Sequence, residues 1–173
     1  MMKNKIVSKN YSIWQVVTLT FLRILIGWHF LYEGLAKLLD STWSSQAYLV
    51  NSTGPFSPFF KSLATSESLM IVDILNEWGL ILIGLGLFLG FLSKPAKIFG
   101  VILLFLYYIT YPPIAGTGVE LYVQGNYWIV NDQLIEIGAL LVLFVFPTSY
   151  ITGLDRFLFY KKKNQLHPKT IND

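Results

Sequence analysis

The fold is decided by the stretch from Ile13 to Glu33, IWQVVTLTFLRILIGWHFLYE, which is apolar for most of its length. A helix needs roughly 20 mainly apolar residues to cross the ~30 Å hydrocarbon core of a bilayer. This stretch is long enough, and three comparable stretches follow at 69–92, 96–111 and 128–147. The sequence therefore predicts an all-α membrane protein, a bundle of four transmembrane helices.

The composition agrees with a chain embedded in lipid. The 173 residues are 54% hydrophobic and 13% charged, whereas soluble domains average about 25% charged residues. The absence of cysteine excludes disulfides, thiolate metal sites and cysteine-bound iron–sulfur clusters within this chain. The formal net charge of +3 is spread over several segments and forms no compact basic face, so we expect no nucleic acid partner.

The basic residues predict how the bundle is oriented. Most of the 13 lysines and arginines precede the first span, separate the second from the third, or follow the fourth, and only Lys37 and Lys61 lie in the loops on the other side. The positive-inside rule then places both termini in the cytoplasm. We expect a cytoplasmic N-terminal segment at 1–12, a transmembrane domain at 13–150 and a basic amphipathic cytoplasmic tail at 151–173. The long 34–68 loop is expected to cap the outer end.

Three ionisable side chains fall near the middle of the predicted spans, namely Arg23, Glu77 and Glu136. A charged side chain at mid-membrane costs about 2.5–3.5 kcal/mol on insertion scales. We therefore expect the three to meet in a polar pocket in the outer half of the bundle, and we assign them the catalytic role. One arginine cannot neutralise two carboxylates, so one glutamate is expected to hold and relay a proton. A purely structural role, in which these charges fix the helix register, stays open.

A quinone would suit such a pocket, because its reduction takes up protons and its ring packs against aromatic side chains. The candidate quinone-binding residues are aromatic or polar: Trp28, His29, Glu33, Lys37, Trp78, Tyr107, Tyr108, Asn131 and Asp132. His29 and Glu33 are one helical turn apart and supply two metal ligands, fewer than a metal site uses. We expect quinone as the electron acceptor, and no metal, haem or flavin.

The order of these residues resembles a known family. The first span carries Arg23-x-x-x-Gly27-x-x-Phe30-x-x-x-Gly34-x-x-Lys37, the second Glu77-x-Gly79, and the fourth Asn131 with Leu134-Ile135-Glu136. This arrangement resembles the DoxX family of small four-helix membrane proteins. The DoxD-like branch is the most similar, through Trp43, Gly54-Pro55, Tyr107-Tyr108, Pro112-Pro113 and Gly153-Leu154-Asp155, and the resemblance covers roughly residues 20 to 158.

The resemblance implies a protein of the bacterial inner membrane. For DoxD-like members it further implies a subunit of a thiosulfate:quinone oxidoreductase, which passes electrons from thiosulfate to quinone. A small partner subunit or a homo-oligomer fits this interpretation. The alternative function is a non-catalytic membrane scaffold for redox or stress-response proteins. A small transporter is less favoured, because no pair of internal repeats surrounds a site at mid-membrane.

Overall fold

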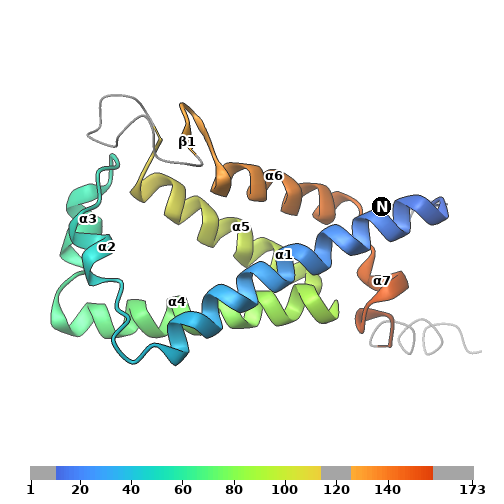
Figure 1. Ribbon diagram of the computed structural model, residues 1–173, viewed down its shortest axis with the longest axis horizontal. Helices are drawn as coiled ribbons and strands as arrows, with labels where there is room; N and C mark the ends of the chain where they lie inside the picture. Colours follow the sequence, from blue (N-terminus) through green and yellow to red (C-terminus); the bar gives the residue numbers. More distant parts are fainter. Residues whose placement is uncertain (1–10, 114–125, 158–173) are drawn as a thin grey trace, which may run out of the picture.

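The structure is a computed structural model that describes residues 11–113 and 126–157. Its long helices are α1 (Ile13–Leu39), α4 (Ser66–Leu89), α5 (Ser93–Thr110) and α6 (Asp132–Val145). The short elements are α2 (Gln46–Val50), α3 (Ser57–Ser62), β1 (Asn126–Tyr127), β2 (Val130–Asn131) and α7 (Ser149–Thr152). The long helices run side by side, with α2 and α3 at one end and α7 at the other (Figure 1). We call these the cap end and the α7 end.

Three of the helices, α1, α4 and α5, are long and apolar enough to cross a membrane. The fourth, α6, has 14 residues, which at 1.5 Å per residue is about 21 Å. The predicted fourth span at 128–147 is therefore too long. Its first residues form the turn and second strand of the β1–β2 hairpin. Helix α6 begins only after them, where the Asn131 side chain accepts a hydrogen bond from the Leu134 backbone N–H at 3.0 Å.

The first span is longer than predicted. Ser12 and Gln15 form a capping box at its start, in which each side chain accepts a hydrogen bond from the other residue's backbone N–H. The helix then continues past the predicted end at Glu33 to Leu39, because no residue in between interrupts it. The segment expected as a long cap loop is consequently shorter, and part of it folds into α2 and α3.

Glycines bring α1 and α4 into close contact. A Cβ at Gly27 would lie 2.5 Å from the Phe88 backbone nitrogen, and one at Gly84 would lie 2.4 Å from that of Leu31. Small residues on this face of α1 therefore let α4 approach closely. We call this close contact between α1 and α4 the seam, and beside it Phe30 is buried in the core of the bundle.

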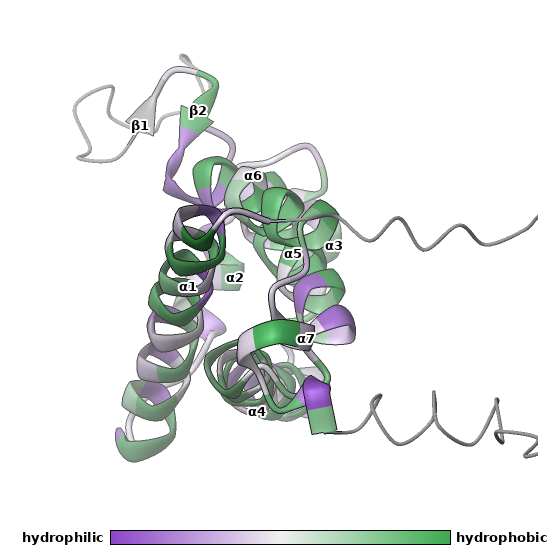
Figure 2. Ribbon diagram, turned by 90° about the vertical axis from the view of Figure 1, so that its right-hand side faces the viewer, coloured by the Kyte–Doolittle hydropathy of each residue, from purple (hydrophilic) through white to green (hydrophobic). Residues whose placement is uncertain are grey.

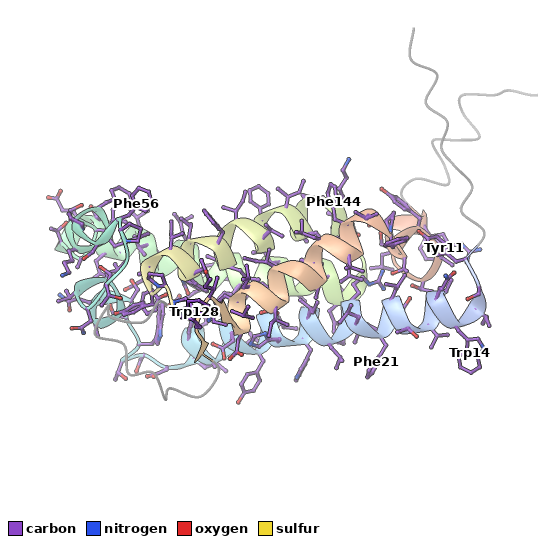
Figure 3. The ribbon with its side chains drawn as sticks, turned by 90° about the horizontal axis from the view of Figure 1, so that it is seen from above. Tyr11, Trp14, Phe21, Phe56, Trp128 and Phe144 are labelled. Atoms are coloured by element: carbon purple, nitrogen blue, oxygen red, sulfur yellow. The ribbon has the colours of Figure 1, made fainter. Side chains whose placement is uncertain are left out.

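The outer faces of the helices are apolar. Figure 2 shows hydrophobic residues along the long helices, and in Figure 3 Trp14 and Phe21 point away from the bundle on α1. Trp14 is 77% exposed and Phe21 is 61% exposed. Large apolar side chains exposed in such number suit contact with lipid rather than water. The fold is all-α, and three of its described helices could span a membrane.

Candidate functional site

A cavity of about 270 Å³ lies among α1, α4, α5 and α6 toward the cap end. It is lined by residues from all four helices, namely His29, Phe30, Glu33, Lys37, Leu80, Leu104, Tyr107, Asp132, Gln133 and Glu136. Phe30, Leu80 and Leu104 are buried and give it an apolar floor. We call it the polar cavity. An apolar floor with a few convergent polar groups is typical of small-molecule binding sites.

His29 and Glu136 connect α1 to α6 across this cavity. The Nδ1 atom of His29 lies 2.9 Å from the Oε1 atom of Glu136, which is hydrogen-bond distance. The His29 side chain is 58% exposed and that of Glu136 is 13% exposed. The pair therefore has one member open to the surroundings and one nearly enclosed. An imidazole held by a carboxylate can take up a proton and pass it to a bound ligand.

A second set of polar contacts runs from α1 to α5. The Nζ atom of Lys37 lies 3.9 Å from Glu33 and donates a hydrogen bond to the Asn76 side-chain oxygen at 3.2 Å. The Asn76 amide donates in turn to the Tyr107 hydroxyl at 2.6 Å. Because that hydroxyl is already an acceptor, its own proton is free to be donated into the cavity. Tyr107 is thus a hydrogen-bond donor beside the pair.

The cap end is tied to the bundle by Asp73. Its carboxylate accepts hydrogen bonds from the Ser44 hydroxyl and the Ser45 backbone N–H, each at 2.9 Å, and from the Ser45 hydroxyl. The Tyr111 hydroxyl donates to the Tyr48 carbonyl at 2.8 Å, which holds α2 on the end of α5. The prediction that this segment caps the bundle is confirmed for its position. The second loop expected on this side, at 112–127, lies largely outside the described residues.

Arg23, Glu77 and Glu136 do not meet at one depth, and this prediction is wrong. Arg23 contacts Gly90 at the end of α4, about 20 Å along that helix from Glu77 at 1.5 Å per residue. Glu136 contacts His29 instead. Helical spacing within one span does not determine the axial offset between spans, which depends on where each helix begins and ends. Of the three, the polar cavity contains Glu136 alone.

Five of the nine predicted quinone-binding residues line the cavity: His29, Glu33, Lys37, Tyr107 and Asp132. The other four lie elsewhere. Trp28 and Trp78 are 54% and 50% exposed on outer faces. The Tyr108 hydroxyl donates to the Ile129 carbonyl at 2.9 Å, and Asn131 caps α6.

Sequence reasoning missed two polar residues near the cavity. Gln133 lines it, and Asn76 connects Lys37 to Tyr107. A signal for Asn76 was present, because a carboxamide inside an apolar span usually hydrogen-bonds to another helix.

The fold and the polar cavity define a class: an α-helical protein with three helices able to span a membrane and a polar cavity at one end of the bundle. Comparison of the chain with protein-family models, with curated proteins and with solved structures gives no match. The function is therefore argued from the cavity and from the resemblance seen in the sequence.

Proposed function

We propose that this chain is a membrane redox subunit that binds a quinone head group in the polar cavity and supplies protons for its reduction. The observation that carries this proposal is the His29–Glu136 hydrogen bond above an apolar floor. A flat quinone ring suits that floor, and its two carbonyl oxygens suit donors on the rim. A volume of about 270 Å³ fits a head group rather than a whole isoprenoid quinone.

The proposed chemistry balances as a two-electron, two-proton reduction. Two electrons enter the ring, and one proton is added to each carbonyl oxygen to give the quinol. The His29–Glu136 pair delivers one proton and the Tyr107 hydroxyl is placed to deliver the other. His29 is 58% exposed, so the His29–Glu136 pair can be reprotonated from outside after each turnover.

The electron donor is proposed to bind elsewhere. The cavity carries the carboxylates of Glu33, Asp132 and Glu136 against the single ammonium of Lys37, and this balance repels a dianion such as thiosulfate. Two thiosulfate ions yield one tetrathionate and two electrons, which matches one quinone reduced. If thiosulfate is the donor, as the DoxD-like resemblance implies, a partner subunit binds it and this chain passes the electrons to quinone.

The proposed topology follows from the same interpretation. We place α6 in the membrane with α1, α4 and α5, and we place both termini in the cytoplasm of a bacterial cell. Support comes from the packing of α6 on α5, with Leu140 and Leu143 fully buried, and from the uneven distribution of lysine and arginine in the sequence.

The test uses the full chain purified in detergent and reconstituted in nanodiscs. Its lipids are extracted to look for co-purified quinone, and quinone reduction is followed with thiosulfate, with and without neighbouring gene products. We expect bound quinone in the wild type. We expect Glu136→Gln to retain quinone and to lower turnover at least tenfold, because a positioned general acid contributes about 10²–10⁴ in rate.

Glu67→Gln is the matched control, since it makes the same change at an exposed glutamate in the first turn of α4. It should leave both quinone content and turnover unchanged. Equal turnover in Glu136→Gln and wild type would leave the His29–Glu136 pair with a structural role. Absence of quinone and of turnover in the wild type, under all conditions, would favour the scaffold interpretation instead.

A further inference from the structure

The α7 end contains a second group of charges that the polar cavity does not use. Arg23 on α1, Lys97 on α5 and Asp155 after α7 are each 2% exposed. Asp155 attracts both cations, and Arg23 repels Lys97. Two buried cations and one buried anion leave an excess positive charge of one, and an uncompensated buried charge is costly.

Asp155 forms its hydrogen bonds with other groups. Its carboxylate accepts from the Leu92 backbone N–H at 2.7 Å, from the Ser93 N–H at 3.2 Å and from the Ser93 hydroxyl at 2.8 Å. Leu92 has a φ of 50°, so the carboxylate also holds a strained turn between α4 and α5. Within the described residues, no carboxylate lies within salt-bridge distance of Arg23 or Lys97. The hydrogen bonds of the Asp155 carboxylate are thus made to the backbone and side chain at the start of α5.

Several donors at this end are left without an acceptor. In the part of the chain that the structure describes, four buried side-chain atoms have no hydrogen-bond partner, and they are Arg23 Nε, Arg23 Nη1, Thr148 Oγ1 and Ser149 Oγ. Lys97 donates one bond, to the Leu143 carbonyl at 3.1 Å, and an ammonium has three protons to donate. All these atoms lie on segments that meet at the α7 end.

Glycines shape the space around the guanidinium. A Cβ at Gly90 would lie 2.7 Å from both Arg23 Nη1 and the Gly153 Cα, and one at Gly153 would lie 2.8 Å from the Ser149 carbonyl oxygen. The backbone therefore packs closely against Arg23 on this side, which limits the size of any ligand that the unpartnered guanidinium donors could hold. We propose that the α7 end binds a small monovalent anion, of the size of chloride, between Arg23 and Lys97.

This anion neutralises the excess charge and accepts hydrogen bonds from the free donors of Arg23. It thereby links α1 to the α4–α5 turn and to the segment that carries α7. The inference is independent of quinone binding, because Arg23 and Lys97 do not line the polar cavity. The site is structural, and its loss loosens the α7 end without altering the cap end.

The test measures the melting temperature of the full-length protein in detergent at constant ionic strength, as sodium chloride replaces sodium gluconate. We expect a saturable rise of about 3–5 °C when chloride reaches ten times its dissociation constant. Equilibrium dialysis with radiolabelled chloride should give one site per chain. Lys97→Gln and Arg23→Gln should abolish both signals.

Lys94→Gln is the matched control, because Lys94 lies on the same helix but is exposed, with its ammonium 6.0 Å from the centre of the Phe144 ring. It should keep the chloride response. Equal melting temperatures in chloride and gluconate together with no saturable chloride binding by the wild type would overturn the proposal, even if the variants fail to fold. A response to sulfate alone, or one that survives in Lys97→Gln, would also overturn it.

Discussion

The two ends of the bundle contain charged side chains in opposite surroundings. At the cap end, His29 and Glu33 have side chains 58% and 48% exposed, and each lies beside a group of opposite or complementary charge. At the α7 end, Arg23, Lys97 and Asp155 are each 2% exposed, and their charges do not cancel. The first end is open and the second is enclosed.

This difference in exposure suits the two ends to different roles, exchange of protons and ligands at one and support of the fold at the other. Groups that are partly exposed can gain and lose protons and can admit a ligand at little cost to folding, since exposed ion pairs contribute only about 0–1 kcal/mol. Enclosed charges cannot be changed cheaply, because removing one partner leaves the others unpaired in a medium of low dielectric. We therefore assign turnover to the cap end and helix positioning to the α7 end.

The largest expected effect is at Asp155. Asp155→Asn removes the only buried carboxylate of the described α7 end and leaves Arg23 and Lys97 uncompensated, and it weakens the cap of α5. We expect a loss of about 3–5 kcal/mol in the free energy of unfolding, measured by denaturant titration in mixed micelles.

Glu136→Gln supplies the comparison at the cap end. It also replaces a carboxylate by an amide beside a cationic or neutral partner, but that partner is exposed. Glu136 itself is 13% exposed, but its exposed partner keeps contact with the surroundings, so the cost should stay below that of Asp155→Asn. Similar losses in the two variants would remove the distinction between the ends.

Much of the fold could be predicted from the sequence. The apolar stretches identified α1, α4 and α5, because the length and hydrophobicity of a segment are local properties. The end of α1 and the start of α6 were mispredicted, since each depends on a cap or on tertiary contacts.

The candidate site was predicted only in part, for a physical reason. Side chains on one helix have a fixed spacing, and the three candidates on the first span, His29, Glu33 and Lys37, all line the cavity. Which residue of another helix faces them depends on axial offset, and the expected partner of Glu136 was Arg23 rather than His29. Asp155 was noted only within a sequence motif, and nothing local indicates that it turns back to cap α5.

A smaller effect is expected along the seam that joins the two ends. Gly84→Ala places a methyl group 2.4 Å from the Leu31 backbone nitrogen, which cannot move unless α1 and α4 separate. Overpacking of this kind costs about 1–3 kcal/mol, and the melting temperature should fall accordingly. Quinone binding and chloride binding should weaken together, because the seam supports both sites.

Gly79→Ala provides the control on the same helix. A Cβ at Gly79 would have nothing within 4 Å, and alanine favours a helix over glycine by up to about 1 kcal/mol. This variant should be as stable as the wild type or slightly more stable. A loss equal to that of Gly84→Ala would show that the seam is not the cause.

The smallest effect on stability is expected at Tyr48, which lies on α2 at the cap end. Burial, and then the neighbouring hydroxyls of Tyr107 and Tyr111, raise the pKa of Tyr48 above its ordinary value, against a smaller opposing effect from Thr110. An unfolded tyrosine ionises near pH 10. Below that pH both states are protonated and the contribution of Tyr48 to stability is complete; above it the unfolded state loses its proton first, so stability falls as pH rises toward the folded-state pKa.

Tyr48→Phe removes the ionising group and should make the melting temperature less sensitive to pH between 9 and 11.5, with little change at pH 7. Tyr32→Phe, at a tyrosine that is 59% exposed on α1, should keep the wild-type slope. If Tyr48→Phe keeps that slope as well, ionisation of Tyr48 does not open the cap end, and the alkaline sensitivity arises at another group, such as Tyr111, whose pKa burial also raises.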